Sequence, residues 1–300
     1  MEEWFATDEA CQSYLVKLRW ADGIRCARCH SCAHWETKRG LTMCGGCGYQ
    51  QSVTAGTIFH RSHLPLRLWF RVMWAVTAPK SGVSALGLQR LLGLGSYETA
   101  WMMLQKLRRA MVRPGRDQLS GEVEVDETLV GGVEKGGGRR HLGNKALVVV
   151  AAEVDGRGIG RIRMKRIPDS SAESLLPFVQ GAVRPGTVVV TDGWPSYAGL
   201  PEAHFWHRVH VRGTNPERAS KLLPRVHRVA SLLKRWLLGT HQGGVSRQQL
   251  DYYLDEFTFR FNRRTSRHRG KLFYRLAQQA VAIEPSPYSD LVASRRNHYI

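Results

Sequence analysis

Acidic residues are scarce in this chain of 300 residues. Aspartate and glutamate together number 25 against 44 lysines and arginines, which gives a net charge of +19 at pH 7. Such an excess is larger than solubility requires, and it predicts a polyanionic partner, of which nucleic acid is the usual one. The basic residues are also concentrated, because residues 225–275 contain twelve lysines and arginines and only three acids.

Long apolar segments are missing as well. No stretch approaches the roughly 18 uncharged apolar residues of a membrane helix, and the start, Met1-Glu2-Glu3-Trp4, lacks the basic and apolar regions of a secretory signal. We therefore expect a soluble, cytoplasmic protein with no membrane partner. At about 150 residues per domain the length indicates two or three domains, and a hydrophobic content of 43% suffices for a core in each.

Cysteine is confined almost entirely to one short segment. Two Cys-x-x-Cys pairs, Cys26 with Cys29 and Cys44 with Cys47, flank fourteen residues. This spacing is typical of a zinc ribbon, in which each pair supplies one edge of a tetrahedron of thiolates around Zn²⁺. Disulfides would need an oxidising compartment, which the missing signal sequence disfavours. The zinc ion would be structural and would perform no chemistry.

Other ligand sets remain open within this segment. Cys32 forms a further Cys-x-x-Cys pair with Cys29 and is an alternative to Cys26, and His30 or His34 is an alternative ligand. Cys26 is preferred because it follows Ile24-Arg25 as the first residue of a ribbon knuckle. Cys11 is expected to be a buried residue of a preceding helix.

Two amphipathic segments after the ribbon predict a helix-turn-helix. A buried helix over 69–77 comes first, followed by segments 84–93 and 96–110 joined by a short glycine-containing turn. Ser96 is a suitable N-cap for the second segment, whose apolar face consists of Ala100, Met103, Leu104 and Leu107. In such a motif the second helix contacts DNA, and the candidates on it are Tyr97, Lys106, Arg108 and Arg109.

Two aspartates each follow a run of β-branched residues. Asp126 ends the pattern Glu122–Val125 and Asp192 ends Val188–Thr191, so both are predicted at strand ends. Paired carboxylates in this position are a common way to hold Mg²⁺ against a phosphate. The simpler interpretation is that one caps a helix and the other starts a turn at Asp192-Gly193.

The order of predicted elements favours bringing these aspartates together. After the strand ending at Asp126 come a glycine-rich hairpin near residues 131–138, strands 145–154 and 161–167, a helix over 171–183 and the strand ending at Asp192. A strand over 205–211 and helices over 223–238 and 246–262 follow. This is the ribonuclease-H-like order of an α/β domain with a mixed sheet and flanking helices, in which the first and fourth strands are neighbours.

Several motifs along the chain resemble the bacterial insertion-sequence transposases of the ISXO-like group, which combine a zinc ribbon with an acidic-triad nuclease domain. The resemblance covers almost the whole chain and rests on segments 54–59 with 66–70, 97–101, 125–132, 191–197, 233–241 and 253–264. It implies a DNA transposase that binds terminal inverted repeats, cleaves at the element ends and joins the 3′ hydroxyls to target DNA. Its partner would be double-stranded DNA, and cutting two ends together implies an oligomer on DNA.

The resemblance also assigns candidate catalytic residues. Asp126 would bridge two Mg²⁺ or Mn²⁺ ions and Asp192 would hold one of them, while Lys234 would neutralise a phosphate. The family commonly places glutamate seven residues before this lysine, but this chain has His227 there. Imidazole suits Mn²⁺ or Zn²⁺ better than Mg²⁺. Alternative third ligands are Glu124, Glu256 and Asn262, and further DNA contacts on the same helix are Arg228 and Arg235.

Three histidines, His204, His207 and His210, recur at every third residue of a predicted strand. Side chains alternate between the faces of a strand, so this spacing divides them between both faces and argues against a metal cluster.

We thus expect four regions: helix and ribbon over 1–55, helix-turn-helix over 56–118, catalytic domain over 119–275 and a tail over 276–300. Two other functions remain open. The missing third acid favours a catalytically inactive or domesticated relative that only binds DNA. A structure-selective nuclease or resolvase would explain the carboxylates but gives no reason for a ribbon and helix-turn-helix.

Overall fold

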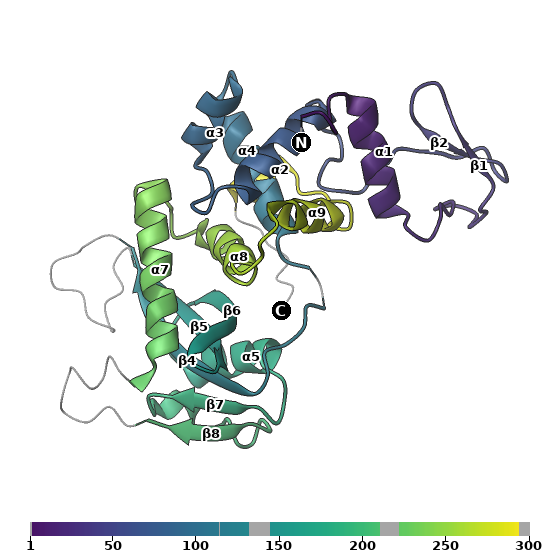
Figure 1. The fold of residues 1–300 in the computed structure, drawn as a ribbon. Coiled ribbons are helices and arrows are strands. Elements are labelled where there is room, and N and C mark those ends of the chain that lie inside the picture. Colours follow the sequence, from purple (N-terminus) through teal and green to yellow (C-terminus); the bar gives the residue numbers. More distant parts are fainter. Residues whose placement is uncertain (1, 114, 132–144, 211–221, 294–300) are drawn as a thin grey trace. The chain divides into compact units, whose positions relative to one another are not determined.

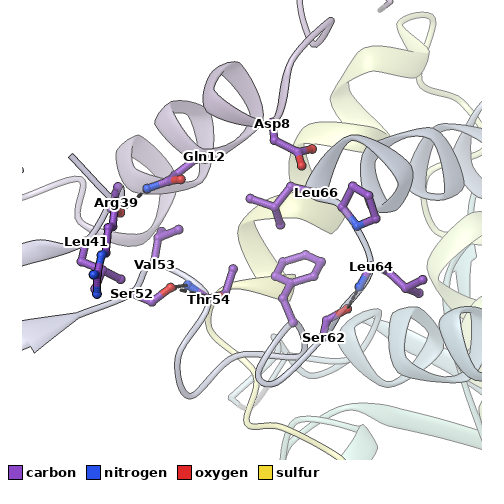
Figure 2. A pocket seen from close by; sticks show the side chains of 13 residues that line it. Asp8, Gln12, Arg39, Leu41, Ser52, Val53, Thr54, Ser62, Leu64 and Leu66 are labelled. Carbon is purple, nitrogen blue, oxygen red and sulfur yellow. Dashed lines mark hydrogen bonds between the residues drawn. The ribbon is translucent and has the colours of Figure 1, made fainter. Parts of the chain in front are cut away.

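A computed structural model describes residues 2–113, 115–131, 145–210 and 222–293 (Figure 1). The described chain divides into two compact units. One consists of residues 2–113 with 266–293, and the other contains the described residues between 115 and 265. The chain therefore leaves the first unit, forms the second and then returns to the first.

The first unit combines a small antiparallel sheet with helices. Strand order in the sheet is β1-β2-β3. The elements in chain order are α1 (Asp8–Arg19), β1 (His34–Glu36), β2 (Thr42–Cys44), β3 (Gln50–Gln51), α2 (Leu66–Thr77), α3 (Ala85–Leu92), α4 (Tyr97–Ala110), α9 (Arg269–Ala280) and α10 (Tyr288–Val292). Cys11 is fully buried in α1, as predicted.

Capping residues delimit the predicted helix pair. The Ser84 side chain accepts a hydrogen bond from Gly87 N at the start of α3, and Gly93 ends this helix with a left-handed φ of 63°. Ser96 then caps α4 by accepting from Glu98 N. The predicted apolar face of α4 is confirmed, because all four of its residues are buried: Ala100, Met103, Leu104 and Leu107.

The carboxyl-terminal helices belong to this first unit. We predicted a tail over residues 276–300, but α9 packs against α1, α2 and α4, and α10 packs against α4. The reason is the apolar face of α9. Phe273 lies on it, with its ring centroid 5.5 Å from that of Phe70 and 5.7 Å from that of Phe5.

The second unit contains a five-stranded mixed sheet with strand order β6-β5-β4-β7-β8. β4 and β7 are parallel neighbours, as the ribonuclease-H-like order predicts. The elements are β4 (Glu122–Val130), β5 (Ala146–Asp155), β6 (Gly158–Ile167), α5 (Ala172–Ala182), β7 (Val188–Thr191), the 3₁₀ helix η1 (Pro195–Tyr197), β8 (Trp206–Val209), α7 (Pro224–His241) and α8 (Leu250–Phe261). The fold class predicted from the sequence is confirmed.

Helices cover both faces of this sheet (Figure 1). Val123 and Val125 of β4 point into the core beneath α5, together with Leu175 and Val179 of that helix. Alternation along β4 turns Glu122, Glu124 and Asp126 to the opposite face, where α7 packs on β4 and β5. The two faces of one strand thus serve a hydrophobic core and a polar surface.

Asp126 does not end its strand as we predicted. β4 continues to Val130, because Thr128, Leu129 and Val130 keep pairing with Val148, Leu147 and Ala146 of β5. The parallel pairing with β7, in contrast, stops at Glu124 and Val190.

The predicted glycine-rich hairpin falls mostly on residues 132–144, outside the described ranges. Among the helices described, none is long and apolar enough to cross a membrane.

The position of α9 leads to a stability prediction. Replacing Phe273 with alanine should destabilise the first unit by about 3–5 kcal/mol, because a large buried side chain is lost and a cavity remains. The neighbouring Tyr274 is 40% exposed, and its alanine variant should cost below about 1 kcal/mol. Urea unfolding of the full chain, followed by tryptophan fluorescence, measures both, and equal effects at the two positions would contradict the packing of α9.

Candidate active site

Asp126 lies in β4, and Asp192 directly follows the last residue of the neighbouring strand β7. Glu124 of β4 pairs with Val190 of β7, so extending this parallel register by two residues sets Asp126 beside Asp192. Adjacent strands are about 4.8 Å apart, which is close enough for two carboxylates to share a cation. Asp126 is buried, whereas Asp192 is partly exposed at the end of β7.

His227 approaches this pair from α7. Its Nε2 lies 3.1 Å from Oδ2 of Asp126, within hydrogen-bonding distance. The imidazole is partly exposed, with 34% of the side chain accessible. The candidate third ligand identified by its spacing from Lys234 therefore lies next to the first aspartate in the structure.

Glu124 anchors the helix that carries His227. Its Oε2 accepts hydrogen bonds from the backbone nitrogens of Arg225 (2.8 Å) and Val226 (3.1 Å), at the first turn of α7. Its Oε1 is paired with Nη1 of Arg225 at 2.9 Å. A carboxylate at this end of a helix satisfies free N–H groups and interacts favourably with the helix dipole. Glu124 was an alternative third ligand, but its oxygens here hold α7.

Arg225 extends the same anchor to the turn between β5 and β6. Its Nε donates to the carbonyl of Gly158 at 3.0 Å, and its Nη2 donates to that of Gly156 at 2.7 Å. β4, α7 and the turn between β5 and β6 thus meet at the ion pair of Glu124 and Arg225. This ion pair fixes the direction in which α7 crosses the sheet, and with it the position of His227.

The other two alternative ligands lie on the α8 side. Asn262 Oδ1 accepts from Ile162 N at 2.8 Å, and its Nδ2 donates to Ile162 O at 3.1 Å, so the amide binds the backbone of β6. Glu256 is fully buried in α8, with its Oε1 3.9 Å from Nη1 of Arg260. The structure thus brings His227, rather than Asn262 or Glu256, to Asp126.

The basic candidates on α7 lie on its exposed surface. Arg228, Lys234 and Arg235 are all exposed. Lys234 is two turns beyond His227, about 10 Å along the axis. Partial desolvation of its ammonium group and the nearby charge of Lys145 lower the pKa of Lys234, as expected of a lysine in a cationic environment.

The four candidates on α4 differ in accessibility. Tyr97 begins the helix and is half-exposed. Lys106 is partly buried, which lowers its pKa, and Arg109 donates to Ser286 Oγ at 3.4 Å. Arg108 is only 1% exposed and donates to Oε1 of Gln105, so its guanidinium is not presented to a DNA backbone. The helical spacing carried this signal, because Arg108 follows the buried Leu104 by four residues and therefore lies on the same face of α4.

The ribbon cysteines form a compact cluster. The four sulfurs of Cys26, Cys29, Cys44 and Cys47 all lie within 4.8 Å of one another, and in the described parts of the chain this is the one group of three or more such ligands. The Cys26–Cys47 and Cys29–Cys44 sulfurs are 3.6 and 3.4 Å apart. A tetrahedral Zn²⁺ with Zn–S bonds of about 2.3 Å requires sulfurs that are roughly 3.8 Å apart, so the cluster fits a structural zinc ion.

The alternatives in the ribbon lie outside this cluster. The set of mutually close sulfurs includes Cys26 and not Cys32, and Nδ1 of His34 is engaged with the Cys32 carbonyl at 2.8 Å. Cys26 therefore completes the set, as preferred from the sequence.

Two of the three periodic histidines contact the strand that leads to Asp192. His207 Nε2 lies 2.9 Å from Thr191 Oγ1, and burial lowers the His207 pKa. His210 follows β8, with its backbone N donating to Thr191 O at 2.9 Å. Its Nδ1 lies 3.2 Å from Leu222 O. Of the three, only His207 lies within β8, because His204 precedes the strand and His210 follows it. The prediction that all three alternate along one strand is therefore wrong.

One pair near the aspartates was missed by sequence reasoning. Tyr197 donates a hydrogen bond to Oε1 of Glu127, and both side chains are buried. The signal was present, because Glu127 continues the core-facing alternation of Val123 and Val125.

Comparison with known proteins agrees with this architecture. The ISXO2-like transposase domain matches residues 118–262, and the transposase zinc-ribbon domain matches residues 6–50. The chain belongs to the ISXO2-like transposase family. It is also similar to a Halobacterium salinarum protein described as an uncharacterized protein in transposable element ISH50. The two are 28% identical over 280 residues, which cover 85% of this chain and 91% of the relative.

The anchor at Glu124 leads to a prediction for the transposase domain. Glu124→Gln should lower its unfolding free energy by about 2 kcal/mol, because a buried hydrogen-bonded charge is lost. Glu122→Gln is the matched control on the same strand, since Glu122 and its partner Arg208 are 36% and 52% exposed and such a pair contributes below about 1 kcal/mol. Urea unfolding compares them, and an equal or larger loss at Glu122 would refute the anchor.

The zinc ribbon leads to a second prediction. Chelation of the metal, or Cys44→Ser, should remove zinc and unfold the ribbon, because the thiolate cluster supplies its folding energy. Cys32→Ser should retain zinc. Metal analysis of the purified proteins, with limited proteolysis of the ribbon, distinguishes these results, and zinc loss in the Cys32 variant would show that another ligand set is used.

Proposed function

We propose that this protein is an active transposase that binds the terminal inverted repeats of its insertion sequence, cleaves DNA at the element ends with divalent metal ions and transfers the freed strands. The observation that supports this most directly is His227, whose imidazole lies 3.1 Å from Asp126. Asp192 directly follows β7, the strand that pairs with β4 beside Asp126. Family membership supports the reaction class.

The donor set suits a divalent cation. Two carboxylates supply hard oxygen ligands, and a neutral imidazole adds a nitrogen that favours Mn²⁺ over Mg²⁺. A bound cation would polarise the scissile phosphate and lower the pKa of an attacking water or hydroxyl. Asp126 and Asp192 would bind and orient the cation, and His227 would complete its coordination. Lys234 would bind a phosphate on the exposed side of α7.

Double-stranded DNA is the proposed partner. The charge of +19 supports strong, salt-dependent binding of phosphates. Arg228 and Arg235 on α7 are the exposed candidates near the catalytic residues, and Tyr97 on α4 is the accessible candidate of the helix-turn-helix. Since two ends must be cut together, we propose that an oligomer assembles on DNA.

A catalytically inactive DNA-binding relative is the second candidate, favoured by histidine in place of the third acid. An active-site test separates the two. The full chain, loaded with zinc, is incubated with duplexes carrying both ends of its own element in Mn²⁺ or Mg²⁺. Nicking at the ends, faster in Mn²⁺, is expected of the active enzyme, whereas DNA binding without cleavage in either metal would support the inactive relative.

Variants of the candidate ligands extend this test. Asp126→Asn and Asp192→Asn should abolish cleavage while leaving end binding intact, because each removes a charged metal ligand. His227→Glu should shift the preference towards Mg²⁺, because it restores an oxygen ligand. Asp155→Asn, at the exposed end of β5, is the control. Unchanged cleavage by both aspartate variants would refute the proposed site.

A further inference from the structure

The hydrogen-bonded ladder between β4 and β7 ends before the two aspartates. Its last pair is Glu124 with Val190, two residues short of Asp126 and Asp192. β4 remains fixed beyond this point, because it stays paired with β5 as far as Val130. The segment that carries Asp192 leaves β7 at Thr191. The separation of the carboxylates therefore depends on a further connection between this segment and β4.

Tyr197 provides such a connection. It is the last residue of η1, five residues after Asp192, and its hydroxyl donates to the carboxylate of Glu127, the residue next to Asp126. Alternation along β4 directs Glu127 to the face opposite Asp126. The pair thus lies on the core side of the sheet, where Tyr197 belongs to the same hydrophobic cluster as Val123, Val125 and Val189.

Other contacts restrain the same segment at its start. Asp192 Oδ1 accepts from Trp194 N at 3.1 Å, and Trp194 Nε1 donates to Ser170 O at 3.1 Å. Gly193 has a φ of +80°, and a Cβ there would lie 2.6 Å from Cγ1 of Val209. The segment from Asp192 to Tyr197 is therefore held at its start by these contacts and at its end by the hydrogen bond of Tyr197 to Glu127.

The energetics favour a permanent contact. A carboxylate buried in an apolar core is costly unless it is hydrogen-bonded, and Glu127 is 8% exposed while Tyr197 is fully buried. Burial raises the Tyr197 pKa well above its usual value, and the charge of Glu127 raises it further. The phenol thus stays protonated and remains a donor at all physiological pH values.

We propose that Glu127 and Tyr197 are positioning residues, which fix the separation of the Asp126 and Asp192 carboxylates for a shared divalent cation. This inference rests on the proposed metal-dependent function and assigns to it two residues that do not touch the metal.

The positioning role is tested by the affinity of the zinc-loaded full chain for Mn²⁺, which is measured from the electron paramagnetic resonance signal of free Mn²⁺. This measurement does not require DNA cleavage. The site is defined as the binding that Asp126→Asn abolishes. Tyr197→Phe keeps the ring and removes only the donor, and it should weaken Mn²⁺ binding about tenfold, the lower range for loss of an outer-shell partner. Glu127→Gln should stay close to the natural chain, because its amide oxygen still accepts from the phenol.

Two controls separate positioning from general stability. Tyr252→Phe removes a hydroxyl from an equally buried tyrosine of α8 in the same unit and should leave Mn²⁺ affinity unchanged. The double variant Glu127→Leu with Tyr197→Phe replaces the pair by apolar side chains. It should regain the unfolding stability that Tyr197→Phe loses, but not the Mn²⁺ affinity.

The outcomes distinguish this inference from the proposed function. Natural affinity in Tyr197→Phe, or recovery of affinity together with stability in the double variant, would overturn the positioning role. Mn²⁺ binding without end cleavage by the natural chain would overturn the proposed function but not this inference. Absence of an Asp126-dependent site would overturn both.

Discussion

Parallel pairing between β4 and β7 joins two segments that are distant in sequence, because β5, β6 and α5 form the crossover between them. This pairing brings the strand that carries Asp126 next to the strand that Asp192 follows. The remaining parts of the site are attached to it. α7 is held at its first turn by Glu124 of β4, and the segment after Asp192 is connected to Glu127 of the same strand. Displacing β4 relative to β7 would therefore disturb every group in the site.

β4 separates two environments by simple alternation. Glu122, Glu124 and Asp126 face α7, whereas Val123, Val125 and Glu127 face the core under α5. A register slip of one residue would exchange these sets and bury the acids in the core. The strand is thereby fixed in register by its own hydrophobic pattern, and the position of Asp126 follows from that pattern.

Much of this could be predicted from local signals in the sequence. The Cys-x-x-Cys spacing identified the ribbon cluster, Ser96 identified the start of α4, and the strand order identified β4 and β7 as neighbours. These predictions succeeded because each depends on residues close together in the chain or on a rule of connection. The spacing from Lys234 also pointed to His227, which lies next to Asp126, while its role as a ligand stays a prediction.

Features that depend on distant partners could not be predicted. The continuation of β4 past Asp126 is determined by pairing with β5, and the apolar face of α9 is explained by the helices of the first unit. Glu124 and Asn262 are plausible ligands by type, but contacts with Arg225 and Ile162 give them structural roles. No local pattern distinguishes a carboxylate that binds metal from one that caps a helix in another part of the chain.

The most direct measurement for the central claim is a crystal structure of the zinc-loaded chain soaked in Mn²⁺, with anomalous data recorded at the manganese edge. The juxtaposition of Asp126 and Asp192 predicts an anomalous peak between the two carboxylates, with the His227 imidazole beside it. Well-ordered aspartates without manganese between them, or manganese bound elsewhere in the transposase domain, would contradict the claim.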